Sequence, residues 1–373
     1  YKLLRKEKDF LLSDTEEQLI AELKNNGYKS WGSLHDEISG EIKVTIDVNG
    51  KSQTMGVAQA LGYSRGSDPV LRESAWRAVQ QAWKVHQTTA AKILNSIFGW
   101  RQDLLKKRSY KKPFHYLDEA LFYENLKKST LDAMFAALEK HHDAILEIPK
   151  TLATILQTSE PNRRTKNQLH PWDLDSPCPI ASTGENIPYE KAISMIQQAY
   201  GQIHPEFGDF VKFMNDSNFI EGRTLPNKSP GGYCTDFCRS GTTRIFLTYT
   251  GSVSDILTVA HEIGHAFHSW LVRDLSFVQK NYTHSLAETA SVFGETVFTD
   301  FLLQQATSKE EKISMLWNEL MRGYAFMINI PARYELETQL NEERMKGPLT
   351  AEKVTALNKA AWEKWYKDSL TEM

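Results

Sequence analysis

The most constraining feature of this sequence is an apolar segment that carries three ionisable side chains. His261, Glu262 and His265 form the pattern H-E-x-x-H. Apolar residues flank the pattern on both sides, namely Ile256, Leu257, Val259, Ala260, Ala266, Phe267, Trp270 and Leu271. A helix that is apolar nearly all round is expected to be buried. Because buried ionisable groups need partners, the fold must bring further polar groups to this helix.

The spacing of the two histidines favours a shared metal ion. Residues four apart on a helix lie almost in register, about 6 Å apart along the axis, so the two imidazoles can converge. Glu262 then points to the adjacent edge, where it can act on a water molecule without being a ligand. This is the arrangement of a water-activating zinc site. The alternative is a hydrogen-bonded polar cluster in the core that holds no metal.

A third ligand is required, and the sequence offers two candidates. His268 lies two turns after His261, about 10 Å along the axis, and no glycine interrupts the helix before it. We therefore interpret His268 as a supporting or packing residue. Glu288 is the predicted ligand, since Glu288, Ser291 and Glu295 share one stripe of a second helix. Ser291 and Glu295 would then orient the ligands; the alternative is a solvated acidic face.

Helical periodicity dominates the rest of the chain. We expect helices over 14–26, 69–107, 117–126, 130–148, 188–201 and 205–216, and again from Ser252 to the C-terminus. Pro149 is expected to end the helix before it. Later breaks are predicted near Leu275–Thr283, at Ile330-Pro331 and at Gly347-Pro348. Residues 156–187 are rich in Pro, Ser, Thr and Asn, which predicts a long crossing loop.

Two segments have β character. Residues 42–48 alternate with period two and precede Asn49-Gly50, which predicts a hairpin. Arg244–Tyr249 is β-branched and aromatic, which predicts a second strand. The predicted fold is therefore mainly α with a small β-sheet. We expect residues 1–60 to be part of a mixed helical and β lobe, and residues 61–373 to form a helical catalytic domain with its core at 225–300.

Composition excludes several classes of protein. The 373 residues are 41% hydrophobic, which excludes a disordered chain, and the net charge of −3 gives no footprint for nucleic acid or an anionic membrane. No apolar run reaches the roughly 18 residues of a membrane span. The three cysteines, Cys178, Cys234 and Cys238, are an odd number, which favours free thiols in a reducing compartment, the cytoplasm. Cys234 and Cys238 could alternatively help to close a structural metal site.

Three sequence blocks resemble the zinc oligopeptidases of the oligoendopeptidase F and thimet oligopeptidase type. They are Pro230-Gly-Gly-Tyr-Cys-Thr-Asp-Phe leading into Arg244-Ile-Phe-Leu-Thr-Tyr-Thr-Gly251, Thr258-Val-Ala-His-Glu-Ile-Gly-His-Ala-Phe-His268, and Leu286-Ala-Glu-Thr-Ala-Ser-Val-Phe-Gly-Glu295. His170-Pro-Trp-Asp-Leu174 is similar to the oligoendopeptidase F branch. The likeness covers nearly the whole chain and is sharpest over 225–300.

The resemblance implies a gluzincin-like peptidase: a two-lobed helical shell around a deep channel that admits short peptides. It implies one Zn²⁺ per chain held by His261, His265 and Glu288, with Glu262 as the general base. It further implies that strand 244–249 is the edge strand on which the peptide backbone lies. The substrate-binding residues expected on this basis are Gly231, Gly232, Tyr233, Phe246 and Thr248. The resemblance carries no oligomeric state.

The chain departs from that family towards its C-terminus. The family carries there a His- and Tyr-containing stretch that binds substrate and stabilises the oxyanion, and nothing after Pro348 resembles it. We therefore assign no such role to Tyr366. With a first residue other than Met, this leads us to expect a chain shortened at both ends. Two alternatives stay open: a zinc-binding but catalytically impaired peptide binder, and an H-E-x-x-H hydrolase of another kind, such as a secreted thermolysin-like protease.

Overall fold

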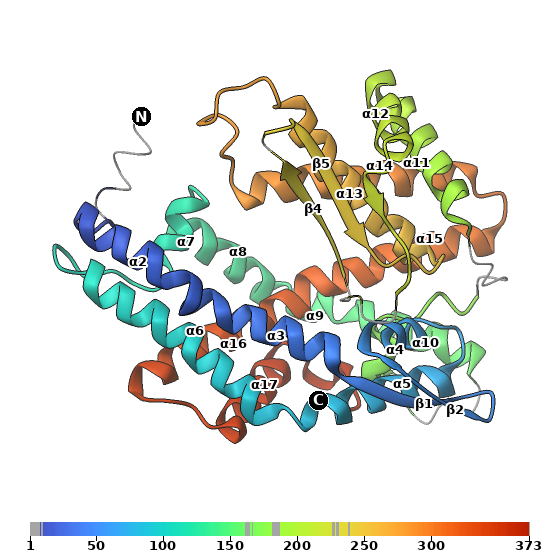
Figure 1. Ribbon diagram of the computed structural model, residues 1–373. Helices are drawn as coiled ribbons and strands as arrows, with labels where there is room; N and C mark the ends of the chain where they lie inside the picture. The colour runs from blue at the N-terminus through green and yellow to red at the C-terminus, as the bar shows by residue number, and fades with distance from the viewer. Residues whose placement is uncertain are drawn as a thin grey trace.

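The computed structural model describes residues 8, 10–160, 165, 167–180, 187–225, 228, 231–237 and 239–372. As the sequence predicts, these residues are mainly helical, with two small sheets. Figure 1 shows two bodies. One contains the three-stranded sheet with α11 to α14. The other contains the N-terminal helices, the β1–β2 hairpin and the C-terminal helices α16 and α17.

The N-terminal part of the chain forms a small mixed unit. Its elements are α2 (Asp14–Asn26), α3 (Tyr28–Glu41), β1 (Lys43–Val48), β2 (Lys51–Gly56) and α4 (Val57–Ser64). Asn49 and Gly50 both have positive φ (56° and 74°), as a tight antiparallel hairpin of this kind requires. The core of this unit joins Val44 and Ile46 to Ala75 and Val79. Packing thus runs across residue 60, and the division predicted there stays a prediction.

The helices that follow are shorter than the periodicity indicates. They are α5 (Pro69–Lys84), α6 (Gln87–Arg108), α7 (Asp118–Tyr123), α8 (Lys128–Lys140), α9 (His142–Ile145) and α10 (Glu147–Ser159). The predicted helix 69–107 breaks at Val85 and His86. The prediction that Pro149 ends a helix is wrong, because Pro149 lies in the first turn of α10. Proline is tolerated there, since its missing N–H would have no partner within the helix.

The body that contains the three-stranded sheet positions the H-E-x-x-H helix. Its elements are α11 (Tyr189–Ile203), α12 (Pro205–Asp216), β3 (Ile220–Glu221), β4 (Gly232–Phe237), β5 (Thr242–Leu247), α13 (Val253–Leu271) and α14 (His284–Gln305). The strand order is β3-β5-β4, with β5 parallel to β3 and antiparallel to β4. The prediction that 244–249 is an edge strand is therefore wrong. Pairing with β3 covers the second edge of β5, and β4 is the edge strand beside α13.

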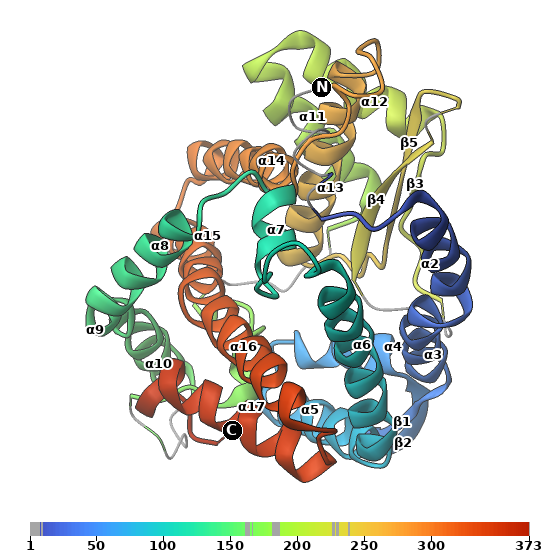
Figure 2. The same cartoon turned by 90° about the vertical axis from the view of Figure 1, so that its left-hand side faces the viewer.

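The C-terminal helices pack against the crossing loop. They are α15 (Lys309–Tyr324), the π-helix η2 (Ala325–Asn329), α16 (Ile330–Lys346), α17 (Ala351–Tyr366) and the 3₁₀ turn η3 (Lys367–Ser369). Figure 2 shows α16 between α6 on one side and α8 to α10 on the other. The predicted break at Ile330-Pro331 takes the form of η2, which separates α15 from α16. The crossing loop contains the 3₁₀ turn η1 (Pro171–Asp173), and its Leu169 pairs with Leu370 near the C-terminus.

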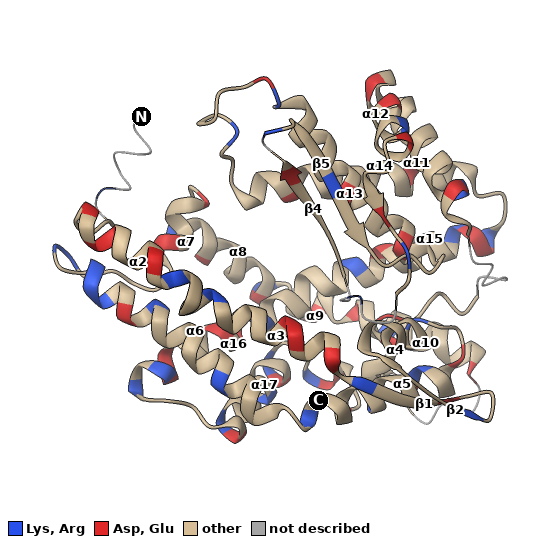
Figure 3. Cartoon of the chain, viewed as in Figure 1, with Lys and Arg blue, Asp and Glu red and all other residues tan. Residues whose placement is uncertain are grey.

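Both signs of charge are interspersed over the two bodies (Figure 3). In the described part of the chain, no helix combines the length and the apolar character that a membrane crossing needs. The surface is therefore consistent with the near-neutral composition.

Helices α13 and α14 are in unusually close contact at Gly264. A Cβ atom at this position would lie 2.7 Å from the Ala290 carbonyl oxygen and 2.8 Å from the Ser291 Cα. Both neighbours are backbone atoms, which cannot rotate away. Gly294 on α14 makes room first for the Tyr200 hydroxyl of α11, and its Cβ would also lie 3.1 Å from the Ala260 carbonyl oxygen of α13. The two helices can lie this close only because each presents a glycine.

We expect Gly264→Ala to destabilise the fold by about 2–3 kcal/mol, because the new methyl group forces α14 away from α13. The matched control is Gly32→Ala in α3, where nothing lies within 4 Å of the added Cβ. That change should stabilise the protein by about 0.5–1 kcal/mol, as for other helical glycines. Urea unfolding of both variants measures the difference. Equal stability of the two variants would contradict the close-packing argument.

The first turn of α14 is capped from outside by Glu124, which follows α7. The Glu124 carboxylate accepts hydrogen bonds from the backbone N–H groups of His284 (3.2 Å) and Ser285 (3.0 Å), and from the Ser285 hydroxyl (2.6 Å). It also contacts the His284 ring at 3.0 Å. Partial burial alone would raise the pKa of Glu124, but the hydrogen bonds from Ser285 and His284 lower it to about 2. A carboxylate at this place also suits the positive end of the helix dipole.

We expect Glu124→Gln to lower the stability by about 1 kcal/mol at pH 7, as loss of an N-cap does. Because the pKa of Glu124 is lowered in the folded state, its contribution is present above the ordinary carboxyl pKa of 4.5 and is lost as the pH falls towards about 2. The difference between wild type and variant should therefore shrink over that range. Urea unfolding at a series of pH values tests this, with the exposed Glu310→Gln as control. A pH-independent difference would refute the ionic cap.

Candidate metal site and catalytic cleft

Helix α13 begins at a capped turn that follows the sheet directly. The Ser252 hydroxyl accepts from the Asp255 N–H, and the Asp255 carboxylate accepts from the N–H and hydroxyl of Thr250 at 2.8 and 2.6 Å. Asp255 thus ties the end of the β5 segment to the first turn of the helix. This connection fixes the position of His261 two turns further along the same helix.

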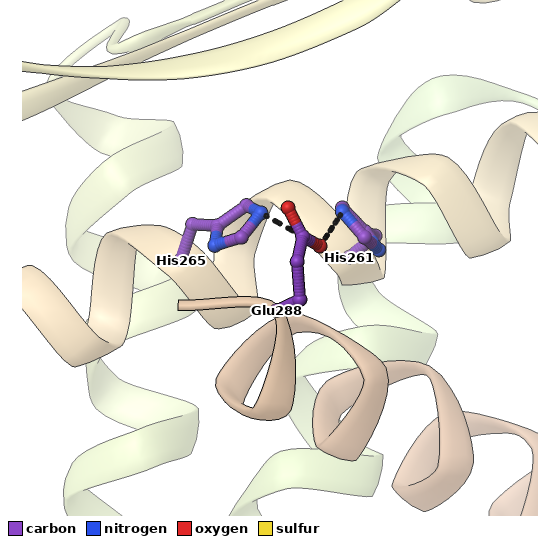
Figure 4. Close-up of side chains that lie close together, drawn as sticks. All are labelled: His261, His265 and Glu288. Atoms are coloured by element: carbon purple, nitrogen blue, oxygen red, sulfur yellow. Dashed lines mark ion pairs between the residues drawn. The ribbon is translucent and has the colours of Figure 1, made fainter. Parts of the chain in front are cut away.

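The structure brings His261, His265 and Glu288 together. Their ligand atoms all lie within 4.8 Å of one another. The Glu288 Oε2 atom lies 3.4 Å from His261 Nε2 and 3.6 Å from His265 Nε2. Figure 4 shows both rings directed at the carboxylate, which rises from the neighbouring helix. Two imidazole nitrogens and one carboxylate oxygen are the donor set of catalytic zinc sites that keep a fourth position open.

Two side chains of α14 hold this group in place. The Ser291 hydroxyl donates to the Glu288 carboxylate at 2.9 Å, one turn away on the same helix. The Glu295 carboxylate lies 2.5 Å from His261 Nδ1, so the other ring nitrogen faces Glu288. Burial alone would lower the pKa of His261, but the hydrogen bond and the charge of Glu295 raise it. In His265, burial and the neighbouring His261 lower the pKa.

Glu262 is held differently from the other carboxylates. Its side chain is buried, the residue being only 5% exposed, and its Oε2 atom has no hydrogen-bond partner among the described residues. Burial raises the pKa of Glu262 to about 7, while the charge of His261 and the backbone N–H of Cys234 act in the opposite direction. An unpartnered carboxylate oxygen beside the ligand group is suited to accept a proton.

The remaining histidines near the motif lie outside the ligand group. His268 packs against Tyr282, with 4.3 Å between the ring centroids, and its Nδ1 has no partner among the described residues. His284 is 94% exposed and pairs with Glu124. Cys234 is a free thiol whose pKa burial raises to about 12, which disfavours the thiolate form of a metal ligand. Cys238 lies outside the described residues.

A cleft of about 780 Å³ borders the site at His261, Glu262 and Glu295. His261, Glu262 and Glu295 line one wall, together with Gly231, Gly232, Thr248 and parts of α15. The opposite wall comes from the body that contains the N-terminal helices, through residues of 58–67 and 174–178. A second pocket of about 420 Å³ lies at the C-terminal end of α13 and includes none of the three ligand candidates. The larger cleft is therefore the candidate catalytic cleft.

The predicted substrate-binding residues are divided between the two faces of the sheet. Gly231, Gly232 and Thr248 line the cleft. A Cβ on Gly232 would lie 3.4 Å from Glu262 Oε1, so the strand approaches the Glu262 carboxylate closely. Tyr233 and Phe246 stack on each other at 5.2 Å and do not line the cleft. Period-two alternation places Tyr233 on the opposite face of β4 from Gly232, and Phe246 on the opposite face of β5 from Leu247, whereas Gly231 and Thr248 lie just outside these strands.

Sequence reasoning missed three features of the site. The first is Arg322 of α15, which donates to Glu295 and to Glu319. The second is the wall of the cleft that comes from the other body. The third is the edge position of β4. None of these leaves a local pattern in the sequence, because each depends on segments that meet only in the folded chain.

Known proteins share both the sequence and the fold. Oligopeptidase PepF of Bacillus subtilis (strain 168) is 21% identical over 384 residues, which cover 98% of this chain and 53% of that protein. Chromosomal oligoendopeptidase F of Lactococcus lactis subsp. cremoris is 24% identical over 303 residues, covering 79% and 47%. The chain thus spans about half the length of these curated relatives.

Solved structures show the same fold. The structure titled PZ peptidase A with inhibitor 2 superposes with a TM-score of 0.78 at 18% identity, covering 98% of this chain and 62% of that one. Oligoendopeptidase-F from Enterococcus faecium gives a TM-score of 0.66 at 19% identity, covering 100% and 59%. These likenesses confirm the predicted mainly helical peptidase fold.

The sequence resemblance to the oligoendopeptidase F type is confirmed on the same grounds. The family model of Peptidase family M3 matches residues 63–372, which include every element of the ligand group and most of the cleft. The chain belongs to Peptidase family M3.

Proposed function

We propose that this chain is a zinc-dependent endopeptidase that cleaves internal bonds of short peptides. One Zn²⁺ per chain would be held by His261, His265 and Glu288. The observation that carries the proposal is the convergence of these three ligand atoms beside the unpartnered Glu262 carboxylate, at the wall of a cleft. Membership of Peptidase family M3 supports peptide hydrolysis as the reaction.

Each side chain then has a definite task. Zinc, when bound here, supplies Lewis acidity, which polarises a carbonyl oxygen and lowers the pKa of a coordinated water from about 15.7 towards 7. Glu262 accepts a proton from the water that attacks the scissile carbonyl carbon. As the C–N bond breaks, Glu262 returns that proton to the leaving amine nitrogen. Glu295 keeps the His261 ring in the orientation that presents Nε2 to the metal.

The peptide backbone would pair with β4. Alternate residues of an antiparallel strand direct their N–H and C=O groups to the partner strand or away from it. The backbone N–H of Cys234 hydrogen-bonds Glu262, and no strand of the described residues pairs with the outer edge of β4. A peptide held there by main-chain hydrogen bonds is recognised largely without regard to its side chains. Gly231, Gly232 and Thr248 would contact it along the cleft. Tyr233 lies on the other face of β4, and Phe246 lies in the central strand β5, whose two neighbours are β3 and β4.

Several observations bear on the alternatives. Glu288 is 56% exposed, and among the described residues no fourth His, Cys, Asp or Glu joins the three ligand candidates, which disfavours a structural metal site. Tyr366 is buried in the core beneath Trp362, consistent with giving it no catalytic role. The free thiols of Cys178 and Cys234 are in keeping with a reducing compartment such as the cytoplasm.

Zinc binding can be tested directly. We expect one equivalent of zinc in the purified chain, and none after His261→Ala, His265→Ala or Glu288→Ala, because two remaining ligands hold the ion too weakly. The matched control is His284→Ala, one turn before Glu288 on the same helix. Metal analysis after dialysis gives the stoichiometry. Full zinc content in all three ligand variants would overturn the assignment.

Turnover is tested with a pool of short peptides followed over time by mass spectrometry, with and without a zinc chelator. We expect chelator-sensitive internal cleavage, and we expect Glu262→Gln to lower the rate by about 10²–10⁴ while keeping zinc. The exposed Glu337→Gln on α16 serves as control. Retained activity in Glu262→Gln would refute the general base. Zinc bound without cleavage in the wild type would instead favour a catalytically impaired peptide binder.

A further inference from the structure

The carboxylate of Glu295 lies between two hydrogen-bonding partners that come from different helices. One oxygen, Oε1, lies 2.5 Å from His261 Nδ1 on α13. The other, Oε2, accepts from Arg322 Nη1 on α15 at 3.1 Å. A second guanidinium nitrogen of Arg322, Nη2, donates to Glu319 Oε2 at 2.5 Å. Three helices are thereby joined through one carboxylate that is only 13% exposed.

Arg322 supplies the second partner that the buried Glu295 carboxylate needs. A carboxylate as buried as Glu295 is costly unless both oxygens have partners, and His261 can satisfy only one of them. With Oε2 fixed by Arg322, the carboxylate cannot rotate, and Oε1 stays in line with His261 Nδ1. That hydrogen bond determines which way the imidazole faces, and therefore where Nε2 points relative to Glu288 and His265.

Arg322 also lines the cleft, so a direct contact with substrate has to be considered. Its two terminal nitrogens are already engaged, one with Glu295 and one with Glu319, and the side chain is 21% exposed. The planar guanidinium is suited to bridging two carboxylates in a fixed geometry, which a lysine ammonium is not. The contacts thus place its action on Glu295.

We propose that Arg322 is a positioning residue for the metal site, which acts on His261 through Glu295. This inference rests on the proposed zinc site. Glu319 holds the far side of the guanidinium and is not required for the effect on His261, because Nη1 alone contacts Glu295.

The test measures the zinc dissociation constant of the apoprotein by chelator competition. We expect Arg322→Met to weaken zinc binding about 10–100-fold, as loss of an outer hydrogen-bond partner does. Arg322→Lys should recover part of the loss, and Glu319→Gln should stay within about threefold of wild type. In a Glu295→Gln background, Arg322→Met should have little further effect, because the two residues act in one chain.

A second readout does not depend on zinc. Long-range ¹⁵N–¹H NMR of the histidine rings in the apoprotein, at a pH where His261 is neutral, reports which ring nitrogen carries the proton. We expect the Nδ1–H form in wild type and a mixture in Arg322→Met. Unchanged zinc affinity together with an unchanged His261 tautomer would overturn the proposal, even if the variant were less stable to heat. Absence of zinc binding in the wild type would overturn the proposed function, while the NMR result would still decide the effect of Arg322 on His261.

Discussion

The close contact of α13 with α14 is the constraint on which the whole site depends. Gly264 and Gly294 remove the side chains that would hold the helices apart, and the Tyr200 hydroxyl donates to the Ala260 carbonyl oxygen at 2.7 Å beside them. A shift of α14 by one turn would move its side chains about 5.4 Å along the axis. Glu288 would then no longer lie opposite both histidines. The packing of the two helices therefore determines the geometry of the three ligand candidates.

The three glutamates of the site have different environments, and the environment of each defines what it can do. Glu288 is more than half exposed and faces two imidazole nitrogens, so it is placed to act as a ligand. Glu295 is buried but has a cationic or polar partner on each oxygen, and His261 and Arg322 lower its pKa against the effect of burial. Glu262 is buried without a partner on Oε2, and its pKa is raised to about 7. Of the three, Glu262 is the one suited to exchange a proton near neutral pH.

The sequence predicts the parts of this site that lie within single helices. The spacing of His261 and His265 and the stripe of Glu288, Ser291 and Glu295 follow from helical periodicity, and the hairpin at Asn49-Gly50 follows from local turn chemistry. Strand order is different, because whether β5 is an edge depends on β3, two residues that no periodicity marks. Pro149 was mistaken for a helix end because proline is compatible both with the residue after a helix and with the first turn of one. The role of Arg322 could not be predicted for a related reason. Its helix carries charges of both signs, and its contact with Glu295 exists only once that helix packs against the helix of Glu295.

Because β4 is an edge strand, it can pair with the main chain of a peptide, while other parts of the cleft contact the peptide's side chains. If a peptide pairs with β4, its main chain is read by the same strand that brings Gly232 and the Cys234 N–H to Glu262. Such pairing fixes the scissile bond relative to the general base, yet it discriminates little between side chains. The described lining of the cleft also includes parts of α15 and residues of 58–67 and 174–178. Under the proposed function, selection among peptides then comes from these side chains, and the stretches 58–67 and 174–178 belong to the body that carries none of the proposed zinc ligands. If the proposed function holds, the side chains that select a peptide are separate from the Glu262 carboxylate that exchanges the proton.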